Sequence, residues 1–338
     1  MRIALDAMGG DHAPHHPVAA AIEALDRFPS IDRIILVGDE DRLRAELLTR
    51  RREPDERLHL YHASQVIEMT EGAVDAVRRK KDSSLVRAID LVKEGAADAI
   101  VSAGHTGALV AAATIKLRNL PGVDRAGIAA ILPSATGVFL LIDAGGNVDA
   151  RPEHLRDFAI MGSIFCKHII RRPSPKVGLL SNGTEETKGN ELTRQTLPLL
   201  KQAPVDFLGY VEGHSLFEGH VDVVVCDGFV GNIVLKTCED LARSTFGWLK
   251  EEITRNPIRM AGAFLARGAF RAVKKRTSAD EYGGALILGV NGICVKAHGS
   301  SSVLAIVNAL RVASEAIDLG VNTKIISEIA QTQLLTRP

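Results

Sequence analysis

Residues 2–11 read RIALDAMGGD, in which a short apolar run ends in an acidic residue and two glycines, and a helical pattern begins soon afterwards. The same arrangement, an apolar run ending in Asp, Ser, Asn or His with glycine, recurs at residues 33–39, 98–107, 137–147, 176–185, 221–232 and 293–302. Apolar strands that alternate with helices are typical of a mainly parallel sheet covered on both faces. We therefore predict an α/β fold whose glycine turns meet at one edge of the sheet.

Helical patterns fill most of the gaps between these runs. They cover residues 17–28, 84–93, 152–170, 231–252, 302–319 and 323–335, and Pro152 stands in the first turn of the third. No low-complexity linker or short-period repeat divides the chain, and the PSP sequence at residues 173–175 is the best candidate for a seam. We predict one large unit over residues 1–338, built from two related subdomains.

The charges of the chain balance, because its 338 residues include 41 Lys and Arg and 41 Asp and Glu. A general nucleic-acid binder needs a basic surplus to displace counterions, so that class is excluded. No apolar run approaches ~18 residues and the first strand starts beside Met1, so neither a membrane span nor a signal peptide is expected. Cys166, Cys226, Cys238 and Cys294 form no CxxC pair and lie in apolar runs, which predicts buried, reduced thiols in a cytosolic protein.

The glycine turns predict an anion site. Each places free backbone N–H groups at the start of a helix, and although glycine also simply permits a tight turn, five or six turns at one edge favour a bound anion such as phosphate. A nucleotide P-loop is not predicted, since Thr184 and Glu185 follow Gly183 where Lys and Ser or Thr are required, and no GxGxxG follows the first strand. The candidate phosphate- and substrate-binding residues are Asp6, Gly9, Gly10, Asp11, Ser102, Gly104, Thr106, Gly107, Asn147, Asn182, Gly183, Thr184 and Gly231.

Four other side chains in these turns are candidates for catalysis. Lys188 could hold a phosphate or a developing oxyanion, although a lone loop lysine is usually solvated. Asn232 could donate its amide to a ligand or could cap a helix. His105 and His298 each precede glycine at the end of an apolar run and could act as acids or bases, or serve as hydrogen-bonded structural residues.

Metal and covalent chemistry are not favoured. The histidines near the N-terminus show none of the tight spacings of metal motifs, so no metal and no cofactor is predicted. There is no GxSxG elbow and no cysteine beside an obvious base. A basic run precedes the helix at residues 84–93 and fits either a solvated face or an acidic partner: Arg78, Arg79, Lys80 and Lys81.

One segment departs from the strand and helix alternation. Residues 257–276, PIRMAGAFLARGAFRAVKKR, place apolar and basic residues on opposite faces of one predicted helix, with Phe264, Leu265 and Phe270 as candidate membrane contacts. Such a helix can lie on an anionic membrane surface. It can equally be a subunit-contact helix whose apolar face packs on protein.

Six motifs occur together and in order: DAMGGD at 6–11, SAGHTGAL at 102–109, LIDAGGN at 141–147, GLLSNGTEETKGNEL at 178–192, DVVVCDGFVGN at 222–232 and YGGALILGVNGICVKAHGSSS at 282–302. In these motifs, over nearly its whole length, the chain resembles the phosphate acyltransferase (PlsX) family, which acts on acyl groups carried by acyl carrier protein. Two residues differ from the family pattern: His105 stands in place of asparagine and Gly146 in place of alanine.

The resemblance implies a fold, a reaction and partners. The fold is a three-layer α/β/α sandwich of the isocitrate dehydrogenase-like and phosphotransacetylase-like type, with two intertwined subdomains and usually two copies. Inorganic phosphate attacks the thioester of a fatty acyl group on acyl carrier protein, and a membrane glycerol-3-phosphate acyltransferase uses the acyl phosphate for phospholipid synthesis. Lys188 and Asn232 are the residues expected to stabilise the charge at the carbonyl oxygen.

The resemblance also implies functions for the two basic segments. It favours peripheral association of residues 257–276 with the inner face of the cell membrane, and it makes residues 78–81 a candidate contact for acyl carrier protein. Two other functions stay open: a phosphotransacetylase that uses coenzyme A, and a regulator that binds phosphate or carrier protein without turnover. A decarboxylating dehydrogenase of the same fold is not favoured, because the sequence shows no cluster of carboxylates for its metal.

Overall fold

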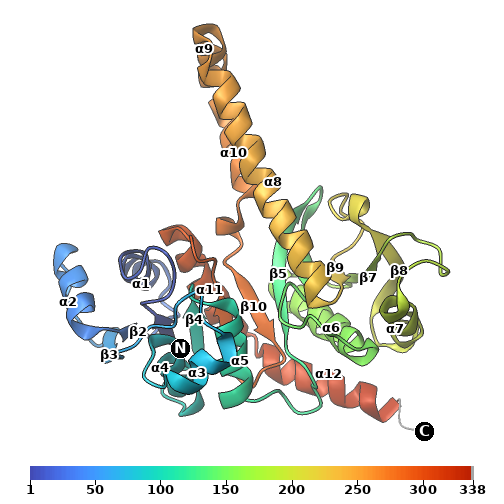
Figure 1. The fold of residues 1–338 in the computed structure, drawn as a ribbon, viewed down its shortest axis with the longest axis horizontal. Helices are drawn as coiled ribbons and strands as arrows, with labels where there is room; N and C mark the ends of the chain where they lie inside the picture. The colour runs from blue at the N-terminus through green and yellow to red at the C-terminus, as the bar shows by residue number, and fades with distance from the viewer. Residues whose placement is uncertain (336–338) are drawn as a thin grey trace.

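An 11-stranded sheet runs through the computed structural model, which describes residues 1–335, and helices cover both faces of the sheet (Figure 1). The order of strands across the sheet is β3-β2-β1-β4-β11-β10-β5-β6-β9-β7-β8. The strands are β1 (Arg2–Asp6), β2 (Arg33–Gly38), β3 (Leu58–His62), β4 (Ala99–Ser102), β5 (Gly127–Ser134), β6 (Gly137–Ile142), β7 (Lys176–Ser181), β8 (Asp206–Glu212), β9 (Val223–Val225), β10 (Ala285–Leu288) and β11 (Ile293–Lys296). The predicted α/β sandwich is confirmed.

The direction of the strands reverses in the middle of the sheet. Strands β3, β2, β1, β4 and β11 are parallel, but β10 is antiparallel to both β11 and β5, and β5 is antiparallel to β6. Strands β6, β9, β7 and β8 are again parallel to one another and therefore run opposite to β1, β4 and β11. The prediction that all glycine turns meet at one edge is wrong, because the carboxyl ends of the two sets of strands lie at opposite edges.

Helices connect these strands largely where the sequence predicts them. The predicted helix at 84–93 matches α4, and that at 152–170 is α6 followed by a short π-helical turn at Cys166–Ile170. The helices are α1 (His15–Arg27), α2 (Glu40–Thr49), α3 (Ala73–Arg79), α4 (Ser84–Lys93), α5 (Thr106–Lys116), α6 (Pro152–Phe165), α7 (Glu191–Gln202), α8 (Gly228–Thr254), α9 (Pro257–Leu265), α10 (Arg267–Thr277), α11 (Val303–Asp318) and α12 (Val321–Leu335).

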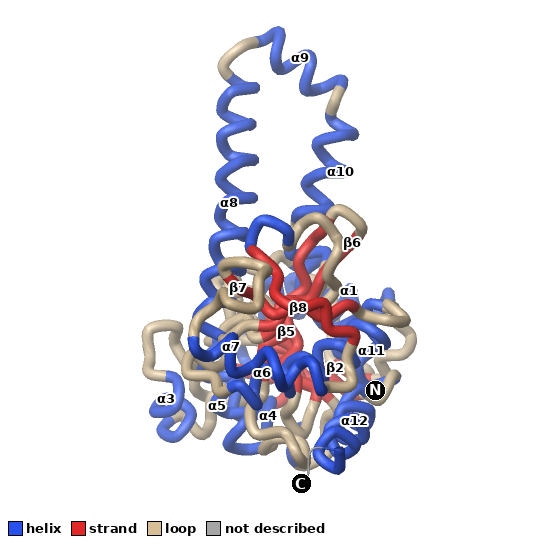
Figure 2. The backbone as a smooth tube through the Cα atoms, turned by 90° about the vertical axis from the view of Figure 1, so that its right-hand side faces the viewer, coloured by secondary structure: helices blue, strands red, loops and turns tan. Residues whose placement is uncertain are grey.

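A helical arm projects from the sheet. The outer part of α8 leads away from the strands, α9 forms the tip and α10 returns beside α8 (Figures 1 and 2). The prediction of one continuous helix over 257–276 is wrong, because α9 ends at Leu265 and α10 begins at Arg267. The apolar residues that a single helix would place on one face therefore belong to two helices. We call residues 228–277 the α8–α10 arm.

Apolar side chains from the strands and helices fill both faces of the sheet, including Phe139, Phe158 and Phe165. Cys166, Cys226 and Cys294 are buried as predicted, but Cys238 is only partly buried because it lies on α8. Residues 173–175 lie between the π-helical turn and β7, and the seam there stays a prediction. No helix within residues 1–335 combines the length and the apolar character that crossing a bilayer demands.

Candidate active site

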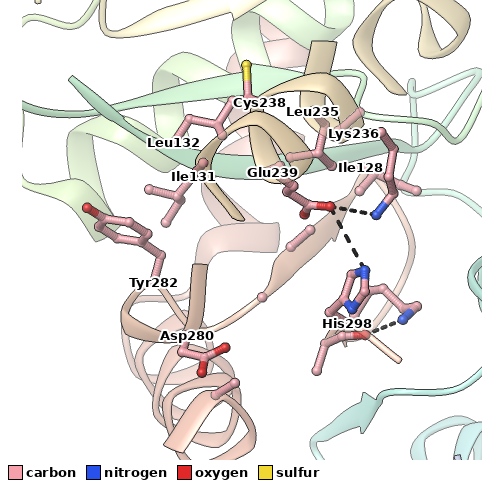
Figure 3. Close-up of a pocket in the computed structure, with 18 of the residues that line it drawn as sticks. Ile128, Ile131, Leu132, Leu235, Lys236, Cys238, Glu239, Asp280, Tyr282 and His298 are labelled. Carbon is pink, nitrogen blue, oxygen red and sulfur yellow. Dashed lines mark hydrogen bonds and ion pairs between the residues drawn. The ribbon is translucent and has the colours of Figure 1, made fainter. Parts of the chain in front are cut away.

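A cavity of about 370 Å³ lies between the central strand β5 and the first half of α8 (Figure 3). Strand β5 contributes alternating apolar residues such as Ile128 and Leu132, while α8 contributes Asn232, Lys236 and Glu239 at helical spacing. The loop after β11 and the first residue of α5 complete one end of the cavity with Ala297, His298 and Thr106. Because the sheet reverses at β10 and β5, this cavity is where groups from its two halves meet.

Lys296 is a functional candidate that the sequence reasoning missed. It is the last residue of β11, lines the cavity and is only 8% exposed. Burial lowers its pKa to about 8, and the nearby Lys236 acts in the same direction, whereas the carboxylates of Asp6, Asp11 and Glu239 oppose the shift. A cation with so low a pKa in a cavity is a typical anion-binding or catalytic group. Its signal in the sequence is a single lysine ending the apolar run ICV.

Three groups beside Lys296 form a charged cluster at the same end. Glu239 Oε2 accepts a hydrogen bond from Lys236 Nζ at 2.7 Å and lies 3.9 Å from His298 Nε2 (Figure 3). The other ring nitrogen of His298, Nδ1, is 2.8 Å from Ser300 Oγ. Burial lowers the pKa of His298 below its usual value, so the neutral imidazole predominates at pH 7.

The predicted residues of the first turns assemble beside this cluster. Asp6 Oδ2 accepts a hydrogen bond from Ser102 Oγ at 2.7 Å, and Ser102 Oγ accepts one from the backbone N–H of Gly104 at 3.0 Å. A side chain at Gly9 would place Cβ 2.5 Å from Asp6 Oδ2, so glycine is required for the close approach. The backbone N–H of Asp11 donates to Gly299 O at 2.8 Å, which ties the β1 turn to the β11 turn.

Other predicted residues of this half have structural roles. Gly10 adopts a φ of +98°, a conformation that glycine allows. His105 caps α5, because its Nδ1 accepts a hydrogen bond from Ala108 N at 3.1 Å, and Thr106 rather than His105 lines the cavity. At Gly107 a Cβ would lie 3.1 Å from Ala73 Cβ, so this glycine lets α3 pack closely on α5.

A buried carboxylate organises the turn after β6. Asp143 accepts hydrogen bonds from the backbone N–H groups of Ile128, Gly145, Gly146 and Asn147 at 2.7–3.1 Å, and from Asn147 Nδ2 at 2.8 Å. Burial raises the pKa of this carboxyl, and these N–H donors oppose the shift. Asn147 Nδ2 also donates to Ala126 O, so its amide hydrogens serve the turn. Asn147 is therefore part of the scaffold of the site.

The start of α8 differs from the prediction. Asp227, rather than Asn232, is the N-cap, and its Oδ1 accepts hydrogen bonds from Phe229 N at 2.9 Å and Val230 N at 3.0 Å. The helix begins at Gly228, three residues before the predicted start at Gly231. At Gly231 itself a Cβ would collide with the carbonyl oxygen of Asp143, so this position requires glycine. Asn232 lies in the second turn and lines the cavity, so its side chain is available to a ligand.

The polar turn after β7 does not join this cavity. The described residues that line the cavity include none of Asn182, Gly183, Thr184 and Lys188. Two strands, β6 and β9, separate β7 from β5. Within the turn, Gly189 N donates to Asn182 Oδ1 at 2.9 Å, and Lys188 is exposed. The roles assigned to these four residues stay predictions.

The basic run ends helix α3, next to the cavity-lining α5. Arg78, Arg79 and Lys81 are exposed. Lys80 instead forms an ion pair with Glu71 at 2.5 Å and donates to Val66 O at 2.7 Å, so it holds the local fold. The surface of this run therefore consists of three basic residues rather than four.

The tip of the α8–α10 arm exposes apolar and basic side chains together. Leu265 is 85% exposed and Phe264 64% exposed, while Arg267 lies over the ring of Phe264 at 4.6 Å from its centroid. Phe270 is partly buried and lines a shallow groove between α8 and α9. Residues 257–276 contain six basic residues and no acidic one. Exposed large apolar groups in a basic surface are typical of an interaction site.

The sheet and the helices on both of its faces define an α/β protein with the fold of phosphotransacetylases. Two solved structures share this fold: the EutD phosphotransacetylase from Staphylococcus aureus, with 16% identity and a TM-score of 0.60, and a phosphotransacetylase from Streptococcus pyogenes, with 18% identity and a TM-score of 0.61. Each comparison covers 94% of both chains. At this level of identity the likeness shows the fold alone.

Sequence relatives identify the family. A family model described as fatty acid synthesis protein matches residues 1–324. A phosphate acyltransferase of Akkermansia muciniphila is 50% identical over 337 residues, covering 98% of this chain and 96% of the relative, and one of Desulfitobacterium hafniense is 50% identical over 330 residues, covering 97% and 98%. The chain belongs to the phosphate acyltransferase family, and it is an acyltransferase whose reaction involves phosphate.

Proposed function

We propose that the protein transfers a fatty acyl group from acyl carrier protein to inorganic phosphate and releases acyl phosphate for phospholipid synthesis. The observation that carries this proposal is the cavity, in which the buried Lys296 stands at one end and apolar residues of β5 and α8 line the other. A cation with a lowered pKa suits phosphate, and an apolar wall suits a fatty chain. The family membership supports the transfer between an acyl group and phosphate.

The proposed chemistry is a direct displacement. A phosphate oxygen attacks the thioester carbonyl carbon, the new C–O bond forms, and the C–S bond breaks with its electron pair leaving on sulfur. The leaving thiol has a pKa near 8.5, so it departs with little help from an acid. Cys238 is the cysteine that lines the cavity among the described residues, and burial raises its pKa, which keeps it as a thiol. This disfavours an acyl-cysteine intermediate.

Four groups have roles in this scheme. Lys296 and the N-terminus of α5 at Thr106 would hold phosphate, because a cation and free backbone N–H groups both favour an anion. Asn232 would donate its amide to the carbonyl oxygen as negative charge develops there. His298 would assist the leaving thiolate only weakly, since it is neutral at pH 7.

The surface next to the cavity offers a site for acyl carrier protein. Arg78, Arg79 and Lys81 are exposed at the end of α3, which packs on α5 through Gly107 and Ala73. An acidic carrier protein docked there would approach the end of the cavity that holds Thr106. The remaining candidates of the β7 turn, including Lys188, lie outside this scheme.

Two further surfaces support proposals about assembly and location. Exposed apolar residues of α8, among them Phe229, Ile233 and Trp248, suit contact with a second copy of the chain in a homodimer. The tip of the arm, with Phe264 and Leu265, suits the inner face of the cell membrane. A peripheral enzyme there would deliver acyl phosphate to a membrane glycerol-3-phosphate acyltransferase.

The test is a trapping experiment. The chain is incubated with palmitoyl-acyl carrier protein and phosphate, and hydroxylamine converts acyl phosphate into a hydroxamate that is measured as its coloured iron(III) complex. We expect hydroxamate that depends on phosphate and on the carrier substrate. A parallel reaction with palmitoyl-coenzyme A tests the phosphotransacetylase alternative, and faster turnover there would favour that alternative. No hydroxamate from either donor would refute the proposal.

A further inference from the structure

Mostly apolar residues form one end of the cavity. Its walls are Leu132 and Pro133 at the end of β5, Leu241 and Ala242 on α8, and nearby Phe217 and Thr277, and we define these six residues as the apolar branch. In Figure 3 Ile131, Leu132, Tyr282 and Cys238 lie across the cavity from the cluster of Lys236 and His298. A ligand whose polar group lies near His298 would therefore extend its apolar part along this branch.

The cavity as a whole is long, and the apolar branch forms one end of it. Residues that line the cavity recur along α8 from Asn232 through Leu235 and Glu239 to Ala242, on one face of the helix. The ten helical rises of ~1.5 Å between residues 232 and 242 span about 15 Å. A two-carbon acyl group would leave most of this length empty, whereas a fatty chain would use it.

The branch ends at the base of the α8–α10 arm. Arg276, near the end of α10, donates a hydrogen bond to Ser134 O at 2.6 Å, which fixes α10 to the last residue of β5. Leu241 is 59% exposed and Phe217 is 41% exposed, so this end is open towards the outside. A chain longer than the branch would pass Ala242 and emerge beside the arm.

We propose that Ala242 determines which acyl-chain lengths the enzyme accepts, because its small side chain leaves room for a long chain to pass between α8 and the end of β5. The proposal rests on the proposed function, since the occupant is the acyl group of the substrate. A larger side chain at residue 242 would close the apolar branch to long acyl chains. The inner part of the cavity, near Asn232 and Leu235, would stay free for short ones.

The experiment compares Ala242→Phe with the unchanged enzyme on hexanoyl- and palmitoyl-acyl carrier protein, following the carrier thiol released. We expect kcat/KM for the palmitoyl substrate to fall at least about tenfold, which corresponds to about 1.4 kcal/mol, while that for the hexanoyl substrate changes less than about twofold. Ala242→Leu should give an intermediate loss. The matched control is Thr237→Phe, which adds the same ring at an exposed α8 position outside the cavity lining and should affect both substrates alike.

Equal effects of Ala242→Phe on the two substrates, or no effect, would overturn the proposal. Thermal unfolding shows whether the variant folds; if Ala242→Phe does not, the chain-length ratio of Ala242→Leu decides. Failure of the proposed function has a different signature, because then the unchanged enzyme would release no phosphate-dependent thiol from either substrate.

Discussion

Asp6 and Lys296 are registered against the same residue, Ser102, from opposite sides: Asp6 on β1 and Lys296 on β11 both pair with this last residue of β4. Residues in one register row of a sheet point to the same face, so a buried carboxyl and a buried ammonium stand on either side of the Ser102 hydroxyl. Asp6 accepts the Ser102 hydrogen bond at 2.7 Å, and Lys296, whose Nζ donates to Ala297 O, lines the cavity. This row links the turn after β1 to the candidate active site.

Loss of the Lys296 charge should abolish most of the activity without weakening the fold. Lys296→Met keeps the length of the side chain, and because burial disfavours the Lys296 ammonium and lowers its pKa to about 8, removing this charge should not destabilise the fold. We expect kcat/KM for phosphate to fall by about 10²–10³, as when an enzyme loses one preorganised electrostatic donor. The control is Lys93→Met at the exposed end of α4. Steady-state kinetics with near-unchanged activity of Lys296→Met would exclude Lys296 from the phosphate site.

The pH dependence of activity should follow the pKa of Lys296, which burial lowers from 10.5 to about 8. The ammonium form is lost as pH rises through about 8, so kcat/KM for phosphate should fall on the alkaline side. Stability should change in the opposite sense. Between about pH 8 and 10.5 the unfolded chain binds more protons at Lys296 than the folded chain does. The contribution of Lys296 to the free energy of unfolding therefore increases with pH over this range.

Lys296→Arg provides the control for this pH dependence. A guanidinium stays charged throughout the range, so the variant, whatever its absolute rate, should lose the fall near pH 8. Rate profiles and denaturant unfolding between pH 6 and 10 measure both quantities. An alkaline fall that is the same in Lys296→Arg would assign it to another group.

The exposed arginines of α3 should affect the affinity for carrier protein and leave chemistry unchanged. In the double variant Arg78→Glu and Arg79→Glu, we expect KM for acyl-acyl carrier protein to rise about three- to tenfold with little change in kcat, because exposed charge pairs are each worth up to about 1 kcal/mol. The salt dependence of KM should weaken as well. Lys80 is left unchanged because it pairs with Glu71. Lys93→Glu is the control, and an equal effect there would indicate a general charge effect.

The tip of the arm should anchor the protein to anionic vesicles. Phe264→Glu combined with Leu265→Glu removes two large apolar contacts and adds two negative charges, so we expect vesicle binding to fall at least about tenfold. Leu48→Glu on α2 is the matched control, since Leu48 is 67% exposed but lies far along the chain from the arm. Flotation of the double variant with vesicles as efficiently as the unchanged protein would rule out the tip as the anchor.

Local patterns in the sequence predict seven of the eleven strands and most helices, because apolar runs and helical spacing report burial directly. The strands β3, β5, β8 and β10 are not among the predicted runs. The reversal at β10 and β5 has no such signal: it depends on long-range pairing such as Leu286 with Ala129 and Ala129 with Ile142. For this reason the predicted single edge of glycine turns is wrong, and Lys188 lies apart from the cavity that holds Asn232.

In the candidate site, too, some residues could be predicted from local patterns and others depend on long-range strand pairing. Asp6, Ser102 and Gly104 could be predicted as a group because each lies at or just after the end of a parallel strand in one half of the sheet. Lys296 could not, since only the pairing of β11 with β4 brings the end of the apolar run ICVK into the row of Asp6. His105 illustrates the opposite error: its position suggests chemistry, but its Nδ1 caps a helix.

Transfer of radiolabelled phosphate measures the proposed reaction itself. The chain is mixed with palmitoyl-acyl carrier protein and labelled phosphate, and the lipid fraction is extracted and counted in parallel with the free carrier thiol. We predict one labelled acyl phosphate for each thiol released, with both signals reduced about 10²-fold or more in Lys296→Met. Thiol release without label in the lipid fraction, or undiminished labelling by Lys296→Met, would contradict direct attack of phosphate in this cavity.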